Sequence, residues 1–332
     1  MPQGLTRTDG MMYVEGEGRP WHGLGVAVNG PANAAETIAA ASLNWEVETR
    51  PVYQYAPSEI IGGNQFYRHL EIPNKNAIVR ADTNEVFAVM GSGYEPVQNV
   101  DAFSFFDEVI AQGEAIYHTA GSLFGGRKVW ILAKLPDDIV VTETDKIGKY
   151  ILLSNSHDGS SALRMKFTPI RVVCSNTLSV ALSDTSGFYA KHTRNVLQRA
   201  SEAREVLGLA AQYYDIFATQ VDRLVNARMT VIEVQDYLQK LYNFKEDVSY
   251  DDQDYRVTRA YENTLDLLNH RTNRVGGMEG TKWAAYNAVT YYLDHERTVS
   301  GQDGYELDRR LDSTWFGRGV ELRQKAFNLL VE

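Results

Sequence analysis

Residues 120–136 read AGSLFGGRKVWILAKLP, and this stretch decides the class of fold. Phe124-Gly125-Gly126 supplies the positive φ angles that a tight turn needs. A segment of strand length stands on each side of the turn, over 115–123 and over 127–135. We therefore expect a β-hairpin here.

A second hairpin is expected at His157-Asp158-Gly159-Ser160, where a turn signal separates strands over 150–155 and 162–167. Asn99 stands where a helix N-cap is expected, before apolar residues at helical spacing that end at Gly113. The remaining expectations for this half are a helix over 34–41, strands over 45–53 and 66–72, and a hairpin of 77–80 with 86–90. A further helix is expected to start after Pro169, run through Leu178 and Ala181, and end near Ser186-Gly187.

From about residue 193 onward the pattern is helical. Apolar residues recur every three or four positions over 206–224, and Thr230 with Glu233 predicts a capping box. Further helices are expected over 254–268, 281–297 and 305–331. The predicted fold class is α+β: an N-terminal antiparallel sheet of hairpins with packed helices (1–188), followed by an all-helical bundle domain (189–332).

The composition is that of a folded chain of two domains: 332 residues with 44% hydrophobic and 23% charged residues. Cys174 is the one cysteine, which excludes an intramolecular disulfide and fits a reducing compartment. The first twenty residues lack the pattern of a secretory signal, and no window approaches the apolar length of a membrane span. We therefore expect no membrane partner and a location in the cytoplasm of a bacterial host.

The formal net charge of -10 argues against a protein that coats nucleic acid with its whole surface. The charge is uneven, however. Residues 151–200 hold 6 Lys and Arg against 2 Asp and Glu, so this window is +4 while the remainder is -14. A local basic patch can bind a polyanion because charges farther away are screened by salt.

Alternation along 127–135 places Lys128, Trp130 and Lys134 on one strand face. Two cations beside an indole are typical of a single-stranded nucleic-acid surface, in which cations contact phosphates and an aromatic ring stacks on a base. In the neighbouring hairpin Arg164 and Lys166 alternate with apolar residues. The expected nucleic-acid contacts are Lys128, Trp130, Lys134, Arg164, Lys166, Arg171, Lys191 and Arg194. The alternative is that these side chains only solvate the exposed side of a half-buried sheet.

A catalytic interpretation of the same region uses His157 and Asp158, with Cys174 as a nucleophile or His192 as a further titratable group. A structural turn explains His157 to Ser160 equally well, and Cys174 lies in an apolar run. Asp294 and His295 are candidate metal ligands, although a buried Asp on a bundle helix more often fixes packing. No nucleotide motif is complete, so we expect no cofactor.

Several stretches resemble one family: PWHGLG (20–25), GYEPVQN (93–99), AGSLFGGRKVWILAKLP (120–136), HDGSSA (157–162), RVVCSNTL (171–178) and GTKWAAYNAVTYYLDH (280–295). They resemble the phage- and plasmid-like proteins grouped as domain-of-unknown-function family 932. The resemblance implies a setting in bacterial mobile elements and no particular activity. The order of strands and helices is also loosely similar to that of single-strand annealing proteins.

The leading hypothesis is a phage- or plasmid-encoded protein that binds nucleic acid, with single-stranded DNA favoured, as an accessory of recombination or replication. One alternative is a hydrolase or nucleotide-modifying counter-defence enzyme centred on His157 and Asp158. Another is a structural or assembly protein that acts through homo-oligomer interfaces.

Overall fold

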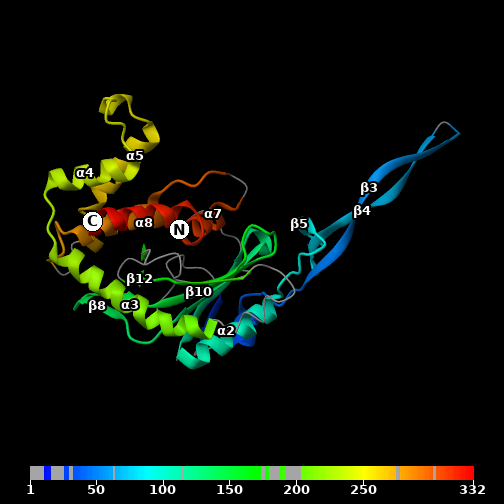
Figure 1. The fold of residues 1–332 in the computed structure, drawn as a ribbon, viewed down its shortest axis with the longest axis horizontal. Helices are drawn as coiled ribbons and strands as arrows, with labels where there is room; N and C mark the ends of the chain where they lie inside the picture. The colour runs from blue at the N-terminus through cyan, green and yellow to red at the C-terminus, as the bar shows by residue number, and fades with distance from the viewer. Residues whose placement is uncertain are drawn as a thin grey trace.

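The computed structural model describes residues 11–15, 26–29, 33–62, 64–113, 115–172, 176–178, 187–190, 203–273, 277–301 and 304–332. Three β-sheets and eight α-helices account for most of these residues. A long hairpin projects from the main body (Figure 1). The fold is α+β, with most of its helices in the C-terminal part, as the sequence predicts.

The largest sheet has seven strands in the order β14-β11-β10-β7-β6-β1-β2. All its neighbouring strands are antiparallel except β1 and β2, which are parallel. The strands are β1 (Met11–Glu15), β2 (Val26–Asn29), β6 (Ile116–Leu123), β7 (Lys128–Lys134), β10 (Tyr150–Ser156), β11 (Leu163–Phe167) and β14 (Gly187–Ala190).

Two smaller sheets flank the large one. The first, in the order β13-β12-β9-β8, consists of β8 (Ile139–Thr142), β9 (Asp145–Gly148), β12 (Ile170–Arg171) and β13 (Asn176–Thr177). The second, in the order β3-β4-β5, consists of β3 (Val47–Ile61), β4 (Asn64–Arg80) and β5 (Val86–Gly91).

The helices are α1 (Ala34–Ala40), α2 (Asn99–Gly113), α3 (Ala203–Asn226), α4 (Val231–Tyr242), α5 (Tyr255–Leu267), α6 (Lys282–Tyr291), α7 (Glu306–Trp315) and α8 (Arg318–Val331). The predicted capping box of α4 is confirmed, because Thr230 accepts from the Glu233 amide and Glu233 accepts from the Thr230 amide. Asp254 caps α5 by accepting from the Arg256 amide. A π-helical turn, η6 (Tyr292–Glu296), continues α6.

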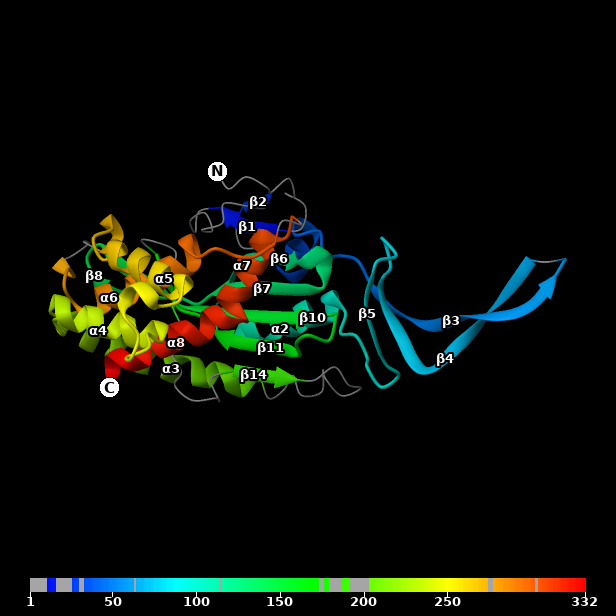
Figure 2. The ribbon, with the colours of Figure 1, turned by 90° about the horizontal axis from the view of Figure 1, so that it is seen from above.

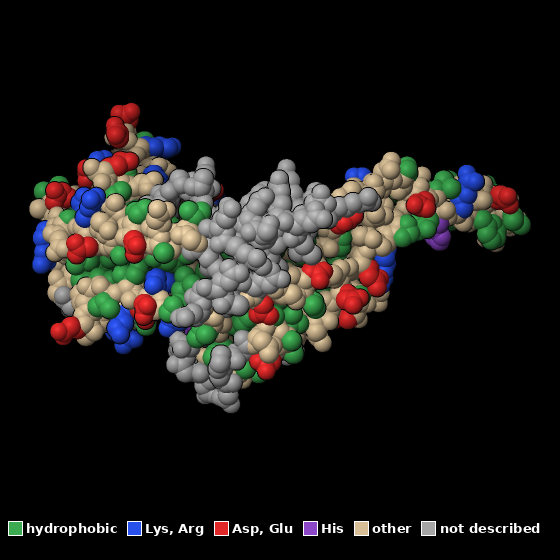
Figure 3. Space-filling view, turned by 60° about the horizontal axis from the view of Figure 1, so that its bottom comes forward, with side chains coloured by type: hydrophobic (Ala, Val, Ile, Leu, Met, Phe, Trp, Pro, Cys, Tyr) green, Lys and Arg blue, Asp and Glu red, His purple; other side chains and the backbone are tan. Residues whose placement is uncertain are grey.

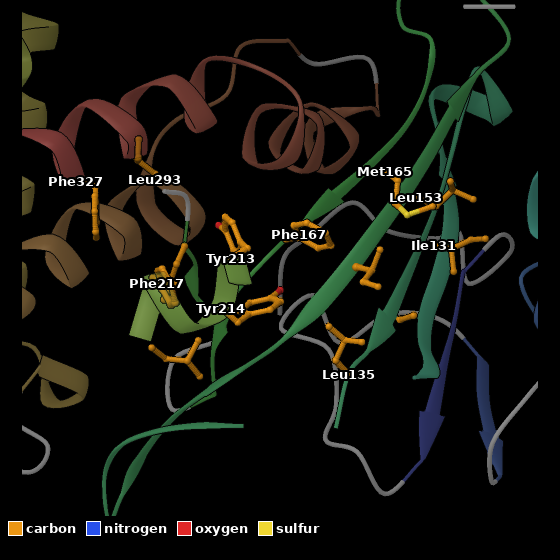
Figure 4. Close-up of a cluster of buried hydrophobic side chains, with 14 of the residues drawn as sticks. Ile131, Leu135, Leu153, Met165, Phe167, Tyr213, Tyr214, Phe217, Leu293 and Phe327 are labelled. Carbon is orange, nitrogen blue, oxygen red and sulfur yellow. The ribbon is translucent and has the colours of Figure 1, made fainter. Parts of the chain in front are cut away.

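One face of the large sheet packs on α1, α2 and α3. Ile131, Leu153 and Met165 of neighbouring strands share this face and are buried. Phe167 continues it toward α3, where its ring lies 5.4 Å from that of Tyr213 (Figure 4). The same apolar cluster runs on through α4, α5, α6 and α8, so the sheet and the helices share one core. Burial of such a continuous cluster is the main force that holds the two parts together.

The other face of the sheet is covered by α7. Trp130 and Leu132 of β7 join Leu311 and Trp315 of α7 in a second apolar cluster. The rings of Trp130 and Trp315 meet edge to face with their centroids 4.7 Å apart. Figure 2 shows α7 lying across β6 and β7. The strand β7 is therefore buried on both faces.

The sequence predictions are wrong at two places in the described residues. The helix expected from Pro169 is replaced by β12 and β13, because Ile170 and Arg171 pair with β9 on one side and β13 on the other. The single helix expected over 305–331 is two helices, α7 and α8, which meet closely at Gly319. A Cβ added at Gly319 would lie 2.5 Å from the Ser313 carbonyl oxygen.

The strands expected at 66–72 and 77–80 are parts of one long strand, β4. The predicted boundary between residues 188 and 189 falls inside β14, which pairs with β11. The position of the domain boundary stays a prediction.

Replacing Trp315 by Ala should lower the free energy of unfolding by about 3–5 kcal/mol, because it removes the ring that covers Trp130. Urea unfolding followed by circular dichroism measures this. Val231→Ala, at an exposed position of α4, is the control and should change stability by less than about 0.5 kcal/mol. Equal effects of the two substitutions would contradict the packing of α7 on the sheet.

Candidate nucleic-acid interface

Lys128 and Trp130 do not lie on an open surface. The Lys128 ammonium group forms an ion pair with Asp312 of α7 and lies 4.8 Å from the centroid of the Phe316 ring. Trp130 is fully buried against Trp315. The expectation of an exposed basic face on β7 is therefore wrong, because α7 covers that face and supplies the counter-charge.

Lys134 lies at the end of β7 and is partly exposed. Its ammonium nitrogen is 3.7 Å from Asp138. Of the three residues expected to contact nucleic acid from β7, Lys134 alone reaches solvent.

Arg171 is a buried structural residue and not a surface contact. Its Nε donates to both carboxylate oxygens of Asp145 at 2.9 Å. Its Nη2 donates to the Thr272 carbonyl at 2.9 Å, and its Nη1 donates to Asn273 Oδ1 at 3.3 Å. The predicted phosphate contact at Arg171 is thus wrong, because this guanidinium joins β9 and β12 to the segment that follows α5.

Arg164 and Lys166 lie where the alternation of β11 places them. Leu163, Met165 and Phe167 are buried, while Arg164 and Lys166 are half-buried on the opposite face. Burial lowers the pKa of the Lys166 ammonium, and the neighbouring Arg164 guanidinium acts in the same direction. The strand thus holds two like charges close together at the β14 side of the sheet.

Lys191, Arg194, His192 and Cys174 lie outside the described residues. Their predicted roles stay predictions. Lys191 directly follows Ala190, which is paired with Leu163 in the register of β14 and β11.

His157 is buried in a packed network. Its Nε2 is 3.0 Å from Asn99 Oδ1, and Asn99 Nδ2 donates to the Leu43 carbonyl at 3.0 Å. The Trp45 ring meets the imidazole edge to face, with centroids 5.3 Å apart. Asn99 was expected to cap α2, but its side chain instead connects His157 to the residue that follows α1.

Asp158 completes a turn. Its Oδ1 accepts from the Ser160 amide at 2.9 Å, as is usual for Asp in a tight turn. His157 is fully buried, so a substrate in solvent does not reach its ring in this structure. The turn interpretation of His157 to Ser160 accounts for these contacts.

Asp294 is a buried packing residue of the π-helical turn η6. It forms an ion pair with Arg323 of α8, and its Oδ1 also accepts from Thr314 Oγ1 at 3.1 Å. Its Oδ2 accepts from the Thr177 amide at 2.8 Å. His295 is partly exposed and its ring lies 4.4 Å from that of Tyr291. Among the described residues, no three His, Cys, Asp or Glu side chains converge as they would around a metal ion.

Sequence reasoning missed the residues of α7 that cover the sheet. Asp312 and Trp315 are about 180 residues from β7 in the chain. The sequence of β7 itself indicates that both faces are covered, because the apolar residues Trp130 and Leu132 on one face alternate with the apolar residues Val129 and Ile131 on the other. A strand that is apolar on both faces indicates cover on both faces.

The chain belongs to the family described as a domain of unknown function (DUF932), whose model matches residues 86–315. The match includes β6, β7, β10, β11 and α7, and it begins after β3 and β4. Searches of curated proteins and of solved structures found no match. None of the helices in the described ranges has both the length and the apolar character that a membrane crossing needs.

Replacing Arg171 by Ala should destabilise the fold by about 3–5 kcal/mol at neutral pH, because it leaves the buried Asp145 carboxylate without its counter-charge. Burial already raises the pKa of Asp145, and Arg171 opposes that rise. In the variant the pKa rises further, so Asp145 takes up a proton in the folded state at a higher pH than in the unfolded state.

The loss of stability should therefore shrink as the pH falls from neutral toward the unfolded value of about 4. Urea unfolding at a series of pH values measures it. Arg223→Ala, at an exposed position of α3, is the control and should show a small effect at every pH. A loss of stability that grows as the pH falls would contradict the buried ion pair of Asp145 and Arg171.

Proposed function

We propose that the protein binds single-stranded nucleic acid without catalysing a reaction, as an accessory of recombination or replication in a bacterial mobile element. One observation supports this most directly: Arg164 and Lys166 form a pair of like charges on one half-buried strand face. In this role the protein acts in the cytoplasm, where the nucleic acid of its host lies.

The charge pair favours a bound anion. At a half-buried position water solvates the Lys166 ammonium group only in part, which disfavours its charged form. Repulsion from Arg164 disfavours the charged form as well, and both effects lower the pKa of Lys166. A phosphate group beside both side chains would supply opposite charge and offset both effects. A strand of nucleic acid carries such groups at regular intervals.

The sequence around β11 is basic. Residues 151–200 carry a charge of +4 in an otherwise acidic chain, although Arg171, one of the six cations, is neutralised by Asp145 inside the fold. Lys191 and Arg194, which follow β14 in the sequence, stay predicted contacts. Lys128, Trp130 and Arg171 are not part of this surface because their side chains are buried in internal contacts. The proposed surface is thus narrower than the sequence suggests and lies at the β14 edge of the sheet.

Replacing Arg164 and Lys166 together by Ala should weaken binding of a single-stranded DNA oligonucleotide. The salt slope should become shallower by about 1.4, since each phosphate contact on a single strand contributes about 0.7. Fluorescence anisotropy between about 50 and 200 mM salt measures both quantities. Because both side chains are half-buried, circular dichroism should check that the variant is folded at the temperature of the binding assay.

Arg223→Ala with Lys240→Ala, two exposed cations on α3 and α4, is the matched control and should leave the slope unchanged. A wild-type chain that binds neither single-stranded nor duplex DNA at low salt would exclude the proposal. A variant that loses stability but binds as well as wild type would show that Arg164 and Lys166 serve the fold alone.

A further inference from the structure

The hairpin of β3 and β4 projects from the body as an arm, which we define as residues 52–75. The two strands pair in antiparallel register from Val47 with Arg80 out to Ile61 with Asn64. None of the described residues of the arm is buried. Figures 1 and 2 show the arm extending well beyond the other elements.

The arm carries large apolar and aromatic side chains in solvent (Figure 3). Six of them are between 49% and 73% exposed: Tyr53, Tyr55, Ile60, Ile61, Phe66 and Tyr67. By the register of the hairpin, Tyr53, Tyr55, Ile60 and Tyr67 share one face, while Ile61 and Phe66 lie on the other. With about 200 Å² for a whole side chain, the first face exposes about 480 Å². An exposed patch of this size on a soluble protein is often an interaction surface.

The aromatic side chains are ordered against one another on one face of the arm. Tyr55 stacks on Tyr67 with ring centroids 4.7 Å apart, and the ring of His69 lies 5.2 Å from Tyr55. Stacked tyrosines lose little conformational entropy on binding, so they favour a protein contact. A two-stranded hairpin is only marginally stable by itself in water, which also favours cover by a partner.

The charge of the arm argues against nucleic acid as that partner. Glu59 and Glu71 balance Arg68 and Lys75, so the arm is neutral. Affinity for a polyanion depends on an excess of Lys and Arg, which the arm lacks. Exposed aromatic rings beside a few charges of both signs are typical of a surface that binds another protein.

We infer that the arm is a dimerisation element, which binds the arm of a second copy of this chain. Two such faces bring about 960 Å² of side-chain surface before the polar side chains and backbone between them are counted, which is close to the about 1,000 Å² that a specific interface needs. The balanced charges make the arm complementary to itself, because a two-fold axis can place the carboxylates of one arm near the cations of the other.

The position of the arm also suits pairing between two acidic chains. Each chain has a net charge of -10, so the bodies repel each other at close range. Ten residues of extended strand span about 33 Å, whereas salt screens charges beyond about 8 Å. Arms that pair near their ends would therefore keep the bodies outside the range of repulsion.

Each strand of the arm contains one proline, Pro57 in β3 and Pro73 in β4, so neither edge is open to strand addition along its whole length. We therefore place the contact between copies on the face that carries the stacked rings of Tyr55 and Tyr67.

Sedimentation velocity of the full chain over a range of protein concentrations tests this. The wild-type chain should dimerise, and Tyr55→Ser with Tyr67→Ser should weaken the dimer at least about 30-fold, as expected for loss of central aromatic contacts. Folding of the body should be unchanged, because neither side chain is buried in it. Circular dichroism of the thermal transition checks this point.

Val231→Ser with Ile232→Ser is the matched control, because these α4 side chains are 72% and 77% exposed but lie far from the arm in Figure 2. The control should dimerise like wild type, and so should the Arg164→Ala, Lys166→Ala variant. The assay contains no nucleic acid, so its result does not depend on the proposed DNA binding.

Three results would overturn the inference: a monomer at every concentration, a dimer that the arm variant forms equally well, or a control that dissociates like the arm variant. A monomer whose arm binds neutral lipid vesicles or a DNA strand would overturn it too, by showing a different occupant.

Discussion

The docking of α7 on the large sheet is the contact on which the rest of the structure depends. A sheet that is apolar on both faces must be covered on both, and α1 to α3 cover only one. Trp315 covers Trp130 on the other face, and Asp312 neutralises Lys128 beside it. This second apolar cluster joins α7 to the strands, while α3 to α6 and α8 join the opposite face of the sheet through the larger core.

Buried polar contacts fix where the helices attach. Asp294 connects η6 to α7, α8 and β13, while Arg171 connects β9 and β12 to the segment after α5. Each buried charge has an opposite charge and further hydrogen bonds around it. Such groups are strongly destabilising when a partner is missing, so they select one arrangement of the helices over others of similar apolar burial. Both residues are functional candidates by sequence, and in the structure both are buried packing residues.

Two surfaces remain for interactions after the core is formed, and they differ in chemistry. The β11 face carries Arg164 and Lys166 near each other and half-buried, a setting that favours an anion. The arm is neutral and aromatic, which favours a second protein surface. The family match begins at residue 86, so the arm lies outside the matched part of the chain. Binding and assembly would thus be carried by separate parts of the molecule.

The sequence by itself determined the local features: the turn at Gly125-Gly126, the capping box of α4 and the alternation in β11 that puts Arg164 and Lys166 on one face. These follow from steric and hydrogen-bonding rules that act over a few residues. Only the tertiary structure decided which faces are covered, since Lys128 meets a carboxylate 184 residues away and Arg171 meets a carbonyl 101 residues away. The sequence around a basic residue on a strand is the same whether water or a distant helix covers its side chain. Which of the two covers it depends on how the whole chain packs, and not on the residues next to it in the sequence.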